Sequence, residues 1–130
     1  MIFFRNWKRK ARNNDVVILD PPAFTKSRSS VKNAVKGYRE INLRAMKLVK
    51  DGGFLATCSC SHFMDYQLFT QTIGQAARNV HKRLRQVEYR TQAPDHPILC
   101  LLMNLYLSEI LHFFNLQRQI GKDGMIAGCL

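Results

Sequence analysis

Hydrophobic and polar residues alternate along this chain in blocks whose lengths predict strands and helices in turn. The first block is the apolar run Val16–Leu19, which is too short for a helix and is typical of a strand buried on both faces. It ends at Asp20, and Pro21 and Pro22 then favour extended backbone that cannot join a sheet ladder. The pattern predicts a core strand whose carboxyl end presents a carboxylate and a stiff loop that ends at Phe24.

A helical pattern comes next. Apolar residues recur every three or four positions from residue 31 to residue 49, which predicts a helix. Ser29 or Ser30 can cap its start, and the glycines Gly52–Gly53 can end it. The basic, serine-rich residues 25–30 that precede it are typical of a loop.

Two more strands and one more helix complete the pattern. Residues Phe54–Cys60 predict a second buried strand, and Asp65 is placed to cap a helix that runs to Val80. Leu84–Tyr89 alternates like a less buried strand, with one slip in the alternation. This βαβαβ order predicts an α/β fold with a parallel sheet and right-handed crossovers.

The two ends of the chain have a different character. Residues 1–12 predict an amphipathic, strongly basic helix. Residues 98–116 are very apolar and predict a helix, while the polar residues within them argue against a membrane span. We therefore expect a domain over residues 1–97 and an atypical apolar helical tail over residues 98–130. Such a helix without a partner would expose an apolar patch and favour self-association.

The net charge of the chain indicates which class of partner it binds. Twenty lysines and arginines against nine aspartates and glutamates give a net charge of +11. This excess favours a polyanionic partner, nucleic acid first, although a basic solvated surface without a dedicated partner is the alternative. The four cysteines show no disulfide-framework spacing, and the apolar start is too short for a signal peptide. Both features favour a cytoplasmic protein that does not engage a membrane.

The chemistry-bearing residues follow the two buried strands. Because the carboxyl ends of parallel strands meet at one edge of a sheet, Asp20 and the segment Thr57–His62 are expected to lie together. Cys58, Cys60 and His62 share one face at the strand period of two. Three interpretations stay open, namely inert small residues packed in the core, a zinc site, and a nucleophilic thiolate.

Four motifs, in order, carry a resemblance to a known family. They are Asp-Pro-Pro-Ala-Phe-Thr-Lys-Ser-Arg, Gly-Tyr-Arg-Glu-Ile-Asn, Gly-Gly-Phe-Leu-Ala-Thr-Cys-Ser-Cys-Ser and Ala-Pro-Asp-His-Pro. Between about residues 16 and 97 the chain resembles class I SAM-dependent ribosomal RNA methyltransferases, and within them the RlmI-like group that makes 5-methylcytosine. The resemblance implies S-adenosyl-L-methionine (SAM) as cofactor and ribosomal RNA as partner. No metal is expected, because the cysteine spacing is not typical of zinc sites and the sequence shows no second cluster of ligands.

The resemblance also implies roles for single residues. Counted from the glycine pair, Cys60 falls where the family's nucleophilic thiol is expected, and it is favoured over Cys58. Asp20 matches a carboxylate that contacts the cytosine and lies at the cofactor edge. The same resemblance implies a substrate-binding loop, in which the prolines hold the flipped base, an aromatic ring stacks on it and two cations contact phosphates: Pro21, Pro22, Phe24, Lys26 and Arg28. A backbone-capping Asp20 and a Phe24 that only packs in the core remain alternatives.

The chain departs from the family pattern on the cofactor side. It shows no glycine-rich loop after a first strand and no acidic residue after a second strand to hold the SAM ribose. We therefore expect the carboxyl-terminal half of a Rossmann-like three-layer sandwich with a mainly parallel sheet, incomplete and inactive by itself. The alternative from another class is a non-catalytic, basic RNA-binding fragment or half-domain.

Overall fold

The computed structural model describes residues 14–25, 27–61, 63–91 and 110–118. They form four strands, two α-helices and one turn of 3₁₀ helix. In chain order these are β1 Asn14–Leu19, η2 Arg28–Ser30, α1 Val31–Met46, β2 Val49–Ser59, α2 Tyr66–Asn79, β3 Lys82–Arg90 and β4 Ile110–Arg118.

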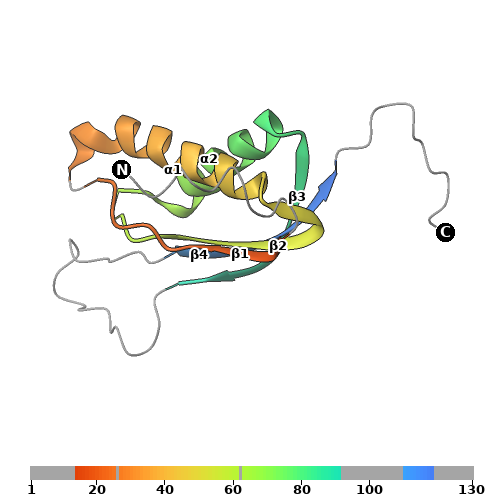
Figure 1. Cartoon of the computed structure of the whole chain (residues 1–130). Helices are drawn as coiled ribbons and strands as arrows, with labels where there is room; N and C mark the ends of the chain where they lie inside the picture. The colour runs from red at the N-terminus through yellow and green to blue at the C-terminus, as the bar shows by residue number, and fades with distance from the viewer. Residues whose placement is uncertain (1–13, 26, 62, 92–109, 119–130) are drawn as a thin grey trace, which may run out of the picture.

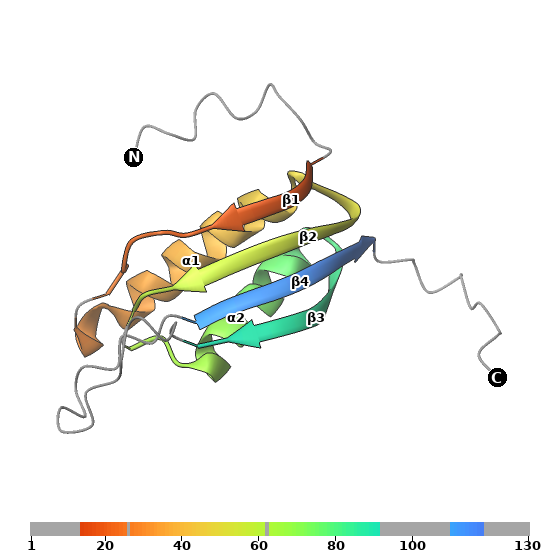
Figure 2. The ribbon, with the colours of Figure 1, turned by 90° about the horizontal axis from the view of Figure 1, so that it is seen from below.

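The four strands make one mixed sheet in the order β1-β2-β4-β3. Strands β1 and β2 pair in parallel, as the βαβ pattern predicted, whereas β4 is antiparallel to both of its neighbours. Since β3 is antiparallel to β4, it runs in the same direction as β1 and β2 (Figure 2). The α/β class is therefore confirmed, and three of the four strands run in one direction. The sheet is mixed rather than purely parallel, because β4 returns between the second and third parallel strands.

Both α-helices cover the same face of the sheet (Figure 1). The described residues thus form two of the expected three layers, and the core lies between α1, α2 and the covered face. Its largest fully buried side chains include Tyr38, Phe69, Met46, Leu55 and Ile73. Of the two α-helices in the described part of the chain, neither has the length and apolar character needed to cross a membrane.

The prediction that β1 is buried on both faces is wrong. Val17 and Leu19 are buried, but Val16 is 48% exposed and Ile18 is 70% exposed. Strand β1 lies at the edge of the sheet, and alternate side chains point to opposite faces. Val16 and Ile18 therefore point to the face that neither α1 nor α2 covers.

The predicted helix over residues 98–116 is wrong over its last seven positions, because residues 110–118 form β4. This strand lies between β2 and β3, so it belongs to the same sheet as the preceding residues and not to a separate tail. His112, Phe114 and Leu116 are buried and alternate at the strand period of two. Residues 1–12 and 98–109, also predicted to be helical, lie outside the described residues.

The connection between α1 and β2 differs from the sequence prediction as well. Helix α1 ends at Met46, and the glycine pair lies inside β2 rather than after the helix. Gly52 has φ +83°, and a Cβ on Gly53 would lie 2.8 Å from the carbonyl oxygen of Asp15. Both positions therefore require glycine.

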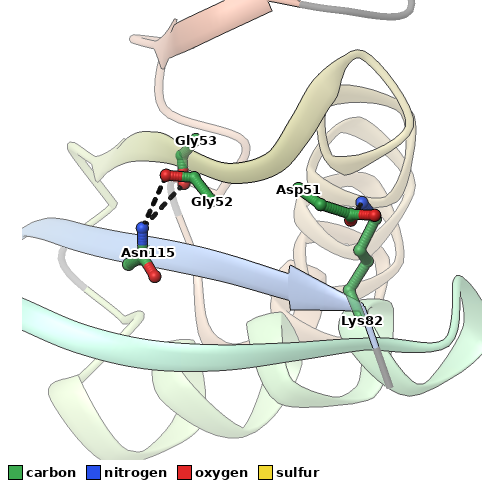
Figure 3. Close-up of polar contacts among 5 residues, drawn as sticks. All are labelled: Asp51, Gly52, Gly53, Lys82 and Asn115. Atoms are coloured by element: carbon green, nitrogen blue, oxygen red, sulfur yellow. Dashed lines mark hydrogen bonds and ion pairs between the residues drawn. The ribbon is translucent and has the colours of Figure 1, made fainter. Parts of the chain in front are cut away.

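The glycine pair is joined to the neighbouring strands (Figure 3). The Asn115 side chain donates hydrogen bonds to the carbonyl oxygens of Gly52, at 2.9 Å, and Gly53, at 3.3 Å. Lys82, at the start of β3, forms an ion pair with Asp51. These contacts fix the amino end of β2 against β3 and β4.

Two local predictions are confirmed. The Asp65 carboxylate accepts a hydrogen bond from the Leu68 amide at 2.7 Å, so Asp65 caps α2. The slip in the alternation of β3 is a bulge, since its pairing with β4 shifts between Gln86 and Glu88.

Candidate active site at the carboxyl ends of β1 and β2

The predicted chemistry-bearing residues follow two strands that end side by side. Leu19, the last residue of β1, pairs with Thr57 of β2. Asp20 therefore leaves β1 at the edge of the sheet where Cys60 and Ser61 leave β2. This juxtaposition was predicted from the parallel order of the two strands, and the pairing register confirms it.

A buried hydroxyl joins the two loops. The Ser61 Oγ accepts a hydrogen bond from the Phe24 amide at 3.1 Å and lies 2.8 Å from the Tyr38 hydroxyl. Ser61 and Tyr38 are both 0% exposed. The loop after β1, the loop after β2 and helix α1 thus meet at one side-chain oxygen.

The Phe24 ring lies partly in solvent and partly against α1. It is 38% exposed, and its centroid lies 4.7 Å from that of Tyr38 in an edge-to-face arrangement. A Cβ on Gly37 would lie 3.5 Å from the Phe24 ring, so this glycine lets the ring approach the helix closely. The ring is anchored by packing and still offers surface to a ligand.

The remaining residues of the first loop are accessible. Asp20 and Pro22 are exposed, and Pro21 is half-buried. Only four residues separate the end of β1 from Phe24, and two of them are prolines. This short, stiff connection limits how far the Asp20 carboxylate can move from the strand end.

The two cysteines occupy different positions. Cys58 lies inside β2, opposite Leu111 of β4, on the sheet face away from the helices. Cys60 lies beyond the last residue of β2, next to Ser61 and the loop contact. Both are half-buried. His62, the third member of the proposed zinc set, lies outside the described residues, and the described part of the chain contains no group of three metal-binding side chains.

The basic loop before α1 is organised by hydroxyl groups. Thr25 is 4% exposed, and its Oγ1 donates to the Ser27 carbonyl oxygen at 2.7 Å. Ser30 occupies the N-cap position of α1, but its hydroxyl donates to the Ser27 carbonyl oxygen instead of capping the helix. Arg28 is exposed, as a phosphate contact requires, and Lys26 lies outside the described residues.

Sequence reasoning singled out neither Ser61 nor Tyr38 as a site residue. The signal for Tyr38 was its position in the apolar stripe of α1, because a buried tyrosine hydroxyl needs a hydrogen-bond partner. Its partner comes from a loop 23 residues away in the sequence, and only the folded chain brings the two together.

Comparisons with known proteins agree with the motifs. No protein-family model matches the sequence. A protein of Methanocaldococcus jannaschii named as a ribosomal RNA large subunit methyltransferase is 42% identical over 100 residues, which is 77% of this chain and 25% of the relative. Ribosomal RNA large subunit methyltransferase I of Photobacterium profundum is 40% identical over 94 residues, covering 72% of this chain and 24% of the relative. The chain thus spans about a quarter of the length of these relatives.

Solved structures show the same fold at low sequence identity. A protein of Streptococcus mutans described as a SAM-dependent methyltransferase superposes with a TM-score of 0.60 and 14% identity, over 79% of this chain and 25% of that one. Trm5b from Pyrococcus abyssi superposes with a TM-score of 0.53 and 14% identity, over 85% of this chain and 27% of that one. The resemblance predicted from the motifs is therefore confirmed: the chain is related to one segment of the ribosomal RNA large subunit methyltransferases and has part of the class I methyltransferase fold.

Proposed function

We propose that this chain forms the target-base side of a SAM-dependent methyltransferase that methylates carbon 5 of cytosine in ribosomal RNA. The observation that carries the proposal is the position of Cys60, which leaves β2 beside the loop after β1 and is joined to it through the Ser61–Phe24 hydrogen bond. The names of the relatives support RNA as the substrate and methyl transfer as the reaction. The proposed place of action is the cytoplasm.

The chemistry needs a nucleophile and a carboxylate. Carbon 5 of cytosine is a poor nucleophile, and addition of the Cys60 thiolate to carbon 6 makes it electron-rich. Asp20, exposed at the same sheet edge, hydrogen-bonds the cytosine amino group and assists protonation of the ring nitrogen. The electron-rich carbon 5 would then form a bond to the methyl group that bound SAM would supply. Loss of the original carbon 5 proton to solvent would let the Cys60 thiolate leave, which restores the aromatic ring as 5-methylcytosine.

The described residues provide only part of a SAM-binding site. SAM supplies the methyl group when it is bound, and Asp20 lies at the edge where it would approach. Among the described glycines, however, Gly37 and Gly74 lie within helices, while Gly52 and Gly53 lie at the opposite end of β2. A glycine cradle for the cofactor is therefore not among the described residues.

The first loop would bind the target nucleotide. The exposed part of the Phe24 ring can stack on an unpaired base, as aromatic side chains do in RNA recognition. Pro21 and Pro22 would keep the loop against that base, and Lys26 and Arg28 would contact flanking phosphates.

A trapping experiment tests the proposed nucleophile. The purified chain is incubated with SAM and a ribosomal RNA transcript that contains 5-fluorocytosine, because fluorine at carbon 5 blocks release of the thiol. In a preparation that binds SAM, we expect a covalent protein–RNA adduct that Cys60→Ser abolishes and Cys58→Ser retains. Because the cofactor cradle is not among the described residues, the same assay is run on a chimera in which residues 16–97 replace the matching segment of the Methanocaldococcus jannaschii relative.

The outcomes separate the candidate residues. An adduct that depends on Cys58 alone would identify Cys58, which lies inside β2, as the nucleophile. If neither the chain nor a folded chimera formed an adduct, while the relative itself did, cytosine chemistry at this edge would be refuted.

A second candidate is a non-catalytic RNA-binding half-domain, which the net charge of +11 favours. The same preparations distinguish it from the enzyme. Tight RNA binding that is unchanged by Cys60→Ser, together with no methyl transfer by the chimera, would identify the binding module.

A further inference from the structure

The Ser61 hydroxyl is the point where three separate segments meet. Its oxygen accepts from the Phe24 amide of the first loop, at 3.1 Å, and contacts the Tyr38 hydroxyl of α1, at 2.8 Å. Ser61 itself follows Cys60 directly. A single buried side chain thus connects the loop that carries Asp20, the segment that carries Cys60, and helix α1.

The backbone of Ser61 is held from both sides. Its amide donates to the Ser59 hydroxyl at 3.3 Å, and its carbonyl oxygen accepts from the Met64 amide at 2.9 Å. Ser61 is therefore fixed relative to the end of β2. A segment that is hydrogen-bonded to the Ser61 hydroxyl is therefore positioned relative to the end of β2.

The Phe24 end of the first loop is equally constrained. The Phe24 ring packs on Tyr38, and the next residue, Thr25, is buried and hydrogen-bonded to Ser27. Only four residues lie between the end of β1 and Phe24, and two of them are prolines, so this connection has little conformational freedom. Fixing the Phe24 amide consequently limits where the Asp20 carboxylate can lie.

We propose that Ser61, supported by the Tyr38 hydroxyl, is a positioning residue that sets the distance between the Asp20–Phe24 loop and the Cys60 thiol. This inference rests on the proposed function in one respect: the distance matters because a thiol and a carboxylate must reach two atoms of the same base. The hydrogen bonds themselves are properties of the chain without RNA or cofactor. They can therefore be tested without an activity assay.

Ser61→Ala and Tyr38→Phe each remove one hydroxyl and leave the remaining packing almost unchanged. Thr72→Val is the matched control, because Thr72 is 1% exposed and its hydroxyl donates to the Leu68 carbonyl oxygen at 2.7 Å within α2. All three variants lose a buried hydroxyl that is hydrogen-bonded. Only the first two lose it between the loops.

Amide hydrogen exchange of the purified full chain gives the first measurement. The Phe24 amide loses its acceptor in Ser61→Ala, and we expect its exchange to accelerate by about fivefold or more. Tyr38→Phe should accelerate it in the same direction, whereas Thr72→Val should not. The double variant should match Ser61→Ala alone, because both substitutions act on one connection.

Thiol alkylation gives the second measurement. The rate at Cys60 relative to the rate at Cys58 is read from peptide masses after treatment with iodoacetamide. We expect Ser61→Ala to change this ratio several-fold and Thr72→Val to leave it as in the parent chain. A merely structural role would instead change the reactivity of both thiols together.

The proposal is overturned if the Phe24 amide exchanges at the parent rate in Ser61→Ala, or if Thr72→Val accelerates it as much. Should Ser61→Ala not fold, Tyr38→Phe decides the question by the same two measurements. Absence of methyl transfer would count against the proposed function and would leave the exchange result as it stands, so the two failures are distinguishable.

Discussion

At the scale of single residues, His112 is the buried group with the clearest consequence for stability. It is 0% exposed, and among the described residues neither ring nitrogen has a hydrogen-bond partner. Its ring lies within 5.5 Å, centroid to centroid, of four aromatic side chains, at distances of 5.2 Å to Tyr66, 5.3 Å to Tyr89, and 5.4 Å to Phe69 and Phe114. Burial without a charge partner lowers the pKa of His112 from 6.5 to about 4.

This pKa predicts how stability depends on pH. Above pH 6.5 the imidazole is neutral in both folded and unfolded chains, so its contribution is fully present. Below that pH, His112 becomes protonated in the unfolded chain, whereas in the folded chain it stays neutral down to about pH 4. We expect the free energy of unfolding to fall by on the order of 3 kcal/mol between pH 6.5 and pH 4, measured by urea unfolding at a series of pH values.

Two variants isolate the effect of His112. His112→Phe keeps an aromatic ring in the cluster. It should make the free energy of unfolding depend less on pH between 6.5 and 4 than it does in the parent chain. His81 is exposed with φ 54°, so His81→Asn, which tolerates that backbone, is the control that removes a histidine outside the aromatic cluster. Equal slopes for the parent chain and His112→Phe would refute the prediction.

At the scale of elements, the glycine pair decides how β2 begins. A Cβ on Gly53 would lie 2.7 Å from Val49 Cγ1 and 2.8 Å from the Asp15 carbonyl oxygen, and the latter is backbone that cannot rotate away. We expect Gly53→Ala to lower the free energy of unfolding by on the order of 2 kcal/mol, measured by urea titration.

Gly74 provides the matched control, because a Cβ there would meet no atom within 4 Å. Since Gly74 lies inside α2, Gly74→Ala should raise stability by up to about 1 kcal/mol. If both substitutions shifted the unfolding midpoint in the same direction, close approach at Gly53 would not be the cause.

At the scale of the whole molecule, the net charge of +11 predicts salt-sensitive RNA binding. We expect Arg28→Ala to reduce the slope of log K against log salt concentration by about 0.7, the value for one phosphate contact on single-stranded RNA. Arg44→Ala changes the net charge equally, but Arg44 is ion-paired with Glu40 at 2.6 Å, so it should leave the slope unchanged. Fluorescence anisotropy over a salt series measures both, and equal slopes for the two variants would mean that only net charge matters.

The sequence by itself determined several local elements and which residues lie together at the candidate site. A short apolar run stopped by prolines, a capping Asp65 and a slipped alternation are local signals, and β1, the start of α2 and the bulge in β3 follow them. The predicted strand–helix–strand order was also enough to place Asp20 and Cys60 at one end of the sheet, because two strands connected through a helix pair in parallel.

Only the tertiary structure decided which partners each element finds. Residues 110–116 have a composition that suits either a buried helix or a strand, and insertion between β2 and β3 selects the strand. The exposure of Ile18 depends on which face the helices cover, and the Tyr38–Ser61 contact depends on α1 crossing the end of β2. These outcomes are long-range, and a pattern of neighbouring residues contains no information about the segment that will pack against it.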